Sequence, residues 1–141
     1  MSEQIYIGID LGGTAIKVGI CNSEGKLLHT YEGATGTEHG AEAVLDNIAK
    51  YSRLIVDQSP YSWEQVAGVG AGLAGFLDIR NGIVKLSPNL NWENVPAKQI
   101  LEQKLGKPVS IDNDAMWRHW GRPGAVQERG FPPGLLYLER E

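Results

Sequence analysis

Cysteine is nearly absent from this sequence, since Cys21 is the only one among 141 residues. A single thiol excludes an internal disulfide framework and is typical of a protein in a reducing compartment. We expect Cys21 to be a small buried side chain on a strand. The sequence also lacks an apolar run long enough to span a membrane, so no membrane partner is expected.

Basic character is also scarce. Thirteen Lys and Arg residues against 17 Asp and Glu residues give a formal net charge of −4. Without a basic block or basic helix, nucleic acid is not an expected partner. The segment 1–4 has neither a charged n-region nor an apolar h-region, so we expect no signal peptide and a cytoplasmic protein. Hydrophobic residues make up 42% of the chain, enough for the core of one domain.

Two runs of alternating apolar residues open the chain, at 5–9 and 16–20. Their period of two predicts two strands joined by a tight turn. That turn, from Asp10 to Thr14, carries a carboxylate, two glycines and a hydroxyl. Glycine N–H groups can approach an anion, so the turn could hold a metal–phosphate complex. The alternative is an ordinary hairpin in which Asp10 only bonds the turn backbone.

The rest of the chain alternates between strand and helix patterns. Apolar periodicity predicts a third strand at 26–31, antiparallel to the second, and a helix at 41–58. It then predicts a buried strand at 66–69, a short helix at 96–105 and a last strand at 109–111. Strand, helix and strand in the second half indicate a parallel sheet. Ligands bind at the carboxyl edge of such sheets.

Gly70, Gly72 and Gly75 have the G-x-G-x-x-G spacing of dinucleotide-binding loops. That fingerprint requires a helix directly afterwards. Here Asn81-Gly82 lies between two apolar runs and predicts a type I′ hairpin instead. We therefore expect the glycines to let a loop pass close to a ligand or a neighbouring strand.

The segment 87–92 shows no regular pattern. Trp92 could stack on a sugar or anchor the loop in the core. The last strand ends in Asp112-Asn113-Asp114. An acid at this edge is either a general base or the N-cap of a following helix, and the sequence leaves both open.

Four segments taken together are similar to a known family. They are Gly8 to Lys17, Gly70 to Gly75, Ser87 to Trp92 and Asp112 to Ala115. In this order and spacing the chain resembles, over about residues 5–115, the N-terminal lobe of a ROK-family sugar kinase. This is the bacterial glucokinase-like group of the actin/hexokinase ATPase superfamily. One departure is Ala74, where many members have proline.

The resemblance implies an α/β fold, the actin-like ATPase (ribonuclease H-like) N-terminal lobe. In this lobe three antiparallel N-terminal strands are followed by parallel strands, and helices flank the mixed sheet. ATP and Mg²⁺ are the implied cofactors. The residues expected to bind ATP are Asp10, Gly12, Gly13, Thr14 and Lys17. Asp10 would act on Mg²⁺ through its waters. Lys17 either faces the phosphates or belongs to a solvated strand face.

The other half of the implied site binds the sugar. The resemblance assigns Gly75 and Asn113 to the substrate and makes Asp114 the base that takes the proton from the attacking hydroxyl. The implied reaction is ATP-dependent phosphorylation of a hexose, with glucose as the first expectation. In such transfers the protein mainly positions the reactants and neutralises charge, and it supplies one base.

After Ala115 the resemblance ends, so we divide the chain into a lobe at 1–115 and an atypical tail at 116–141. Two tryptophans and an Arg-Pro-Gly make the tail a poor helix. If one base were missing at Ala115, the same bases in the restored frame could encode Asn-Val-Ala-Ala-Leu-Gly-Glu-Ala, the helix expected there. We therefore hypothesise a frameshifted tail. The family's second lobe, with its zinc site, would then be absent and the fragment alone inactive.

Two other functions stay open. ROK members include sugar-responsive transcriptional regulators, which carry a helix-turn-helix domain before the kinase-like lobe. A first strand at about Ile5 leaves no room for one, and Asn113-Asp114 keeps the catalytic pair. The chain could also be a non-catalytic sugar-binding remnant. A homodimer is expected of a full-length relative but not of this fragment.

Overall fold

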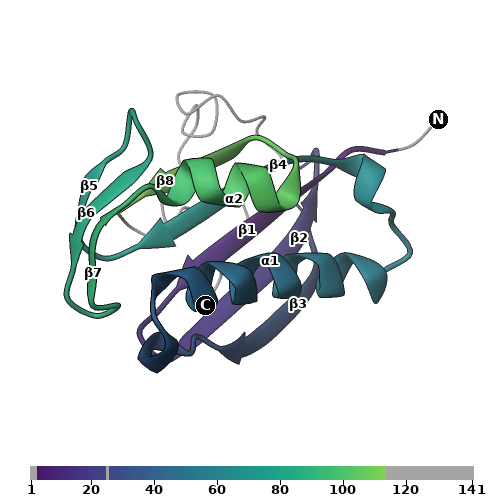
Figure 1. The fold of residues 1–141 in the computed structure, drawn as a ribbon. Coiled ribbons are helices and arrows are strands. Elements are labelled where there is room, and N and C mark those ends of the chain that lie inside the picture. Colours follow the sequence, from purple (N-terminus) through teal and green to yellow (C-terminus); the bar gives the residue numbers. More distant parts are fainter. Residues whose placement is uncertain (1–2, 25, 114–141) are drawn as a thin grey trace.

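A computed structural model of the chain describes residues 3–24 and 26–113. It contains a five-stranded sheet, a three-stranded sheet and two α-helices (Figure 1). The elements in chain order are β1 (Ile5–Leu11), β2 (Ala15–Asn22), β3 (Leu27–Ala34), α1 (Ala41–Asp57), β4 (Val66–Leu73), β5 (Phe76–Asp78), β6 (Ile83–Ser87), β7 (Trp92–Val95), α2 (Ala97–Leu105) and β8 (Val109–Asp112).

The larger sheet has the strand order β3-β2-β1-β4-β8. Strands β1 and β2 pair antiparallel, as do β2 and β3, whereas β4 pairs parallel with β1 and with β8. This confirms the expected mixed sheet, with three antiparallel strands at the start and parallel strands after them. Sequence periodicity located the strands well, although β3 and β4 extend beyond the expected ranges.

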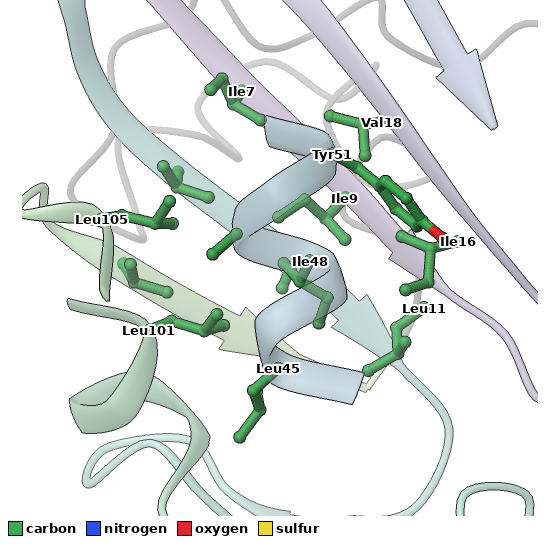
Figure 2. Close-up of a cluster of buried hydrophobic side chains, with 14 of the residues drawn as sticks. Ile7, Ile9, Leu11, Ile16, Val18, Leu45, Ile48, Tyr51, Leu101 and Leu105 are labelled. Carbon is green, nitrogen blue, oxygen red and sulfur yellow. The ribbon is translucent and has the colours of Figure 1, made fainter. Parts of the chain in front are cut away.

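Both α-helices cover the same face of the larger sheet (Figure 1). The alternating isoleucines of β1 and the apolar side chains of β2 point to this face, where they meet α1 and α2 (Figure 2). As expected from its periodicity, α1 buries one stripe: Val44, Leu45, Ile48, Tyr51, Ser52 and Ile55. Helix α2 follows Pro96 and ends at Gly106, whose φ of 69° is a left-handed conformation that favours glycine.

An ion-pair cluster joins the two helices at the surface. The ammonium group of Lys104 on α2 lies 2.9 Å from Glu42 and 2.5 Å from Asp46 on α1. Cys21 is fully buried on β2, and burial raises the pKa of its thiol above the ordinary value. The thiol therefore stays protonated, in agreement with the structural role expected of Cys21. No helix within the described residues is long and apolar enough to cross a membrane.

The smaller sheet has the order β5-β6-β7 and follows directly from the end of β4. The expected hairpin between β5 and β6 is present, but its type I′ turn was wrong. A type I′ turn needs positive φ at both central residues, and only Gly82 has it, at 71°. Asp78 accounts for the difference: its carbonyl accepts the Gly82 N–H and its carboxylate accepts the Asn81 N–H, at 2.8 and 3.2 Å. The turn is therefore longer and closed by Asp78.

Strand β7 was not expected, because no strand was predicted between the irregular segment 87–92 and the helix at 96–105. Trp92 begins this strand and is 2% exposed within the core, which confirms the anchoring alternative and not sugar stacking. The glycine-rich segment also differs from expectation. Gly70 and Gly72 lie inside β4, in register with Gly8 and Asp10 of β1. These two glycines therefore approach a neighbouring strand, and only Gly75 lies in a loop.

Candidate functional site

The carboxyl ends of the three parallel strands β1, β4 and β8 meet at one edge of the larger sheet. Asp10 on β1 is the register partner of Gly72 on β4, and Gly72 is in turn the partner of Asp112 on β8. Residues in one register row share a face, so both carboxylates lie on the sheet face opposite the helices. Two strand spacings separate them by about 10 Å. Gly72 places no side chain between them.

The turn after Asp10 is held by a hydrogen bond within the turn and by two hydrogen bonds from Thr35. The Gly12 N–H donates to the Ala15 carbonyl at 3.0 Å, which closes the turn. Thr35, fully buried after β3, donates its hydroxyl to the Gly12 carbonyl at 2.7 Å and its N–H to the Thr14 carbonyl at 3.0 Å. With both of these carbonyls bound, the turn is fixed in place while Thr14 itself is exposed.

The turn between β6 and β7 lies against this glycine turn. A Cβ added to Gly13 would lie 3.3 Å from the Asn89 carbonyl oxygen and 3.7 Å from the Asn89 Cβ. That approach is tighter than ordinary van der Waals contact. A side chain at position 13 would therefore require the β6–β7 turn to shift by a few tenths of an ångström.

A second contact between the sheets lies at the end of β4. Ser87, fully buried at the end of β6, donates its hydroxyl to the Ala74 carbonyl at 2.7 Å. The next residue, Gly75, has a φ of 146°, and its carbonyl accepts a hydrogen bond from the Asn113 side-chain amide. The Asn113 N–H donates to the Asp112 carboxylate at 2.6 Å. The structure thus brings Gly75 and Asn113 together.

The sequence-predicted site residues therefore occupy one edge of the fold. Asp10, Gly12, Gly13 and Thr14 form the turn at one end, and Gly75 and Asn113 form the other. Lys17 is exposed on β2 as the register partner of Asp10 and of Glu32. It extends the row of charged side chains across the sheet. Asp114, the predicted base, lies outside the described residues.

The donor set indicates which metal chemistry the turn could support. Within residues 3–24 and 26–113, no three His, Cys, Asp or Glu side chains are grouped as a metal site. Mg²⁺ is commonly bound by one or two carboxylates together with water and substrate phosphates. A single carboxylate beside a glycine turn fits a magnesium–nucleotide complex better than a metal held by protein alone.

Sequence reasoning missed the two buried hydroxyls, Thr35 and Ser87. Each bonds a backbone carbonyl far away in sequence, with separations of 23 and 13 residues. Local patterns carry no signal for such pairs. The nearest clue is position, because each residue stands at or directly after the end of a strand in the structure, and polar residues there need a partner once buried.

The strand order and the residues at its carboxyl edge define the N-terminal lobe of an actin-like ATPase fold. The chain belongs to the ROK family, whose model matches residues 6–128. A glucokinase of Thermotoga maritima is 40% identical over 118 residues, covering 82% of this chain and 35% of the relative. The xylose repressor of Caldicellulosiruptor bescii is 32% identical over 125 residues, covering 89% of this chain and 30% of the repressor.

A solved structure supports the same assignment. The ROK family glucokinase of Streptomyces griseus, in complex with glucose and AMPPNP, has a TM-score of 0.70 and 35% identity to this chain. The match covers 83% of this chain and 35% of the glucokinase. The chain thus spans about a third of the length of the curated relatives it matches first.

Proposed function

We propose that this chain is the nucleotide- and sugar-binding lobe of an ATP-dependent hexose kinase, with glucose as the preferred substrate. One observation carries the proposal. The β1–β2 glycine turn and the Gly75–Asn113 pair lie at the same sheet edge, both braced by the smaller sheet. Glucokinase relatives of 37–40% identity support glucose as the proposed substrate. Such a reaction would take place in the cytoplasm.

The phosphate half of the proposed site is the turn from Asp10 to Thr14. The Gly12 N–H is used to close the turn with the Ala15 carbonyl, so the Gly13 N–H, with no Cβ beside it, and the exposed Thr14 hydroxyl would face the phosphates. The Asp10 carboxylate would hold Mg²⁺ through water, and that ion would neutralise charge on the transferred phosphoryl group when bound. Lys17, the exposed side chain of the otherwise buried strand β2, would add positive charge near the phosphates.

The sugar half of the proposed site is Gly75 and Asn113. Because the Asn113 amide nitrogen faces the Gly75 carbonyl, its Oδ1 is left to accept a hydrogen bond from a sugar hydroxyl. Asp114 directly follows and would take the proton from the attacking hydroxyl, a contribution of about 10²–10⁴-fold in rate.

The proposal extends to the organisation of the whole protein. We place the boundary of the lobe at Ala115 and keep the frameshift hypothesis for 116–141, although the family match runs to residue 128. A full-length relative would add a second lobe, which would carry the zinc site, and form a homodimer. Sequencing the genomic locus tests this part: an intact frame without a kinase-like continuation in any register would contradict it.

Binding to this chain tests the site directly. Isothermal titration with Mg·AMPPNP and with a panel of hexoses should show both ligands binding, with glucose the tightest of the sugars. Asp10→Asn should lower the affinity for Mg·AMPPNP about 10-fold, and Asn113→Ala should lower the affinity for glucose about 10-fold. Asp57→Asn and Asn81→Ala, which change exposed residues away from the site edge, are the matched controls and should bind as the parent does.

Two outcomes would contradict parts of the proposal. A chain that binds a sugar but no nucleotide would contradict the kinase and favour a sugar-responsive regulator, as in the repressor relatives. Turnover is measured in the frame-restored protein with a coupled ADP assay. Asp114→Asn should abolish turnover there while glucose binding stays, and equal turnover would contradict the base assignment.

A further inference from the structure

Ser87 has no part in the proposed chemistry, yet it is one of the most completely buried polar residues in the described part of the chain. It is fully buried at the end of β6, and its hydroxyl donates to the Ala74 carbonyl at 2.7 Å. A buried hydroxyl left without a hydrogen-bond partner costs about 1–3 kcal/mol. This bond therefore holds the end of β4 firmly to the smaller sheet.

The peptide after Ala74 is pressed onto the same residue. A Cβ added to Gly75 would lie 3.1 Å from the Ser87 Cβ and 3.2 Å from its Cα, and it would overlap the Leu86 carbonyl oxygen. Backbone atoms of β6 therefore pack directly against Gly75. This packing fixes the position of the Gly75 carbonyl.

The Gly75 carbonyl in turn orients the side chain of Asn113. Its oxygen accepts a hydrogen bond from the Asn113 side-chain amide. Because a carbonyl oxygen can only accept, the amide nitrogen and not Oδ1 must face it. The Asn113 N–H is bound by the Asp112 carboxylate at 2.6 Å. Both ends of Asn113 are therefore fixed, one of them through Gly75.

We propose that Ser87 is a positioning residue for hexose binding. Its hydroxyl fixes the Ala74–Gly75 segment, and the Gly75 carbonyl in turn orients the Asn113 amide so that Oδ1 faces the sugar hydroxyl. The inference rests on the proposed function, because it assigns Asn113 to the sugar. It adds a residue from the smaller sheet that would not touch the substrate.

The test compares two buried serines. Ser52 on α1 is also fully buried and donates to a backbone carbonyl, that of Ile48, at 2.8 Å. Ser52→Ala therefore reproduces the loss of a buried hydroxyl without touching the site. Ser87→Thr keeps a hydroxyl at position 87. Each variant is first compared with the parent by circular dichroism and urea unfolding.

The first readout needs no sugar. In ¹⁵N-labelled chain, Ser87→Ala should shift the Asn113 side-chain amide signals and speed their exchange with water, whereas Ser52→Ala should leave them in place. Unchanged Asn113 signals in Ser87→Ala would overturn the proposal. Since this measurement concerns only the orientation of Asn113, its result does not depend on whether the chain binds a hexose.

The second readout is affinity for glucose. Ser87→Ala should raise the dissociation constant for glucose about 5–10-fold and leave that for Mg·AMPPNP unchanged, and Ser87→Thr should restore it. Equal losses in Ser87→Ala and Ser52→Ala would show a general effect of stability and overturn the proposal. If the parent chain binds no hexose, the proposed function is contradicted, and the Asn113 signals alone decide whether Ser87 positions this side chain.

Discussion

Gly75→Ala is the sharpest test of the link between the two sheets. At a φ of 146° an L-residue is strained, at a cost of about 1–3 kcal/mol. The added Cβ would also overlap the Leu86 carbonyl oxygen and lie 3.1 Å from the Ser87 Cβ. Because these atoms belong to a paired strand, they cannot move aside cheaply, and overpacking adds about 1–3 kcal/mol. We expect a total loss of about 2–6 kcal/mol.

Gly106→Ala is the matched control. Gly106 also has positive φ, at 69°, but nothing lies within 4 Å of its added Cβ. Only the left-handed conformation is penalised there, by about 1–2 kcal/mol. Both variants restrict the unfolded chain equally, a gain of about 0.4–1 kcal/mol that cancels in the comparison. The difference between the variants therefore reports the close approach of Gly75 to β6.

The assay is urea unfolding followed by tryptophan fluorescence and circular dichroism. With a slope of about 1–3 kcal/mol per molar urea, Gly75→Ala should lower the midpoint clearly further than Gly106→Ala does. Equal midpoints would refute the reasoning, because they would mean that the Ala74–Gly75 segment is free to move away from β6. The positioning role of Ser87 would then lose its structural basis.

Two further substitutions test the supports of the fold. Thr35→Val leaves the Gly12 carbonyl without its hydroxyl partner, so it should lower the free energy of unfolding in urea by about 1–3 kcal/mol. It should also lower the affinity for Mg·AMPPNP in titration. Unchanged nucleotide affinity would contradict the role of this hydrogen bond. Partial burial opposes ionisation of Glu102, but hydrogen bonds from Lys98 and the Val109 N–H outweigh it and hold its pKa below the ordinary 4.5. The stabilisation is therefore present above pH 4.5 and lost as pH falls through the folded pKa, and Glu102→Gln should make urea midpoints less dependent on pH between about 5 and 3.

The larger sheet could be predicted because its signals are local. Alternating isoleucines fix the two faces of β1, and a glycine turn before a second alternating run fixes the pairing with β2. Strand, helix and strand then require a parallel neighbour. The carboxyl edge follows from this topology alone, so the placement of Asp10 and Asn113 at one edge was within reach of the sequence.

The smaller sheet was predicted less well because its turn and its last strand depart from simple local patterns. Asn81-Gly82 is typical of a two-residue turn, but Asp78 caps a longer one, and Gly82 packs closely against Lys98 of α2. Strand β7 contains Asn94 in a left-handed conformation, with φ of 55°, which no strand pattern indicates. The close approach of Gly82 to Lys98 joins two elements that a local turn pattern does not relate.

Contacts between residues far apart in the sequence explain why the supports of the proposed site were not predicted, whereas the residues proposed to bind a ligand were. Residues expected to touch a ligand stand at strand ends and carry recognisable chemistry. The residues that fix them, Thr35 and Ser87, are ordinary hydroxyls whose importance appears only when a distant carbonyl is known. Ser87, the last residue of β6, and Asn89, in the turn that follows it, lie two positions apart and approach Gly75 and Gly13 respectively. One short segment therefore sets the spacing between the proposed phosphate and sugar halves, and a change in its packing would be felt in both.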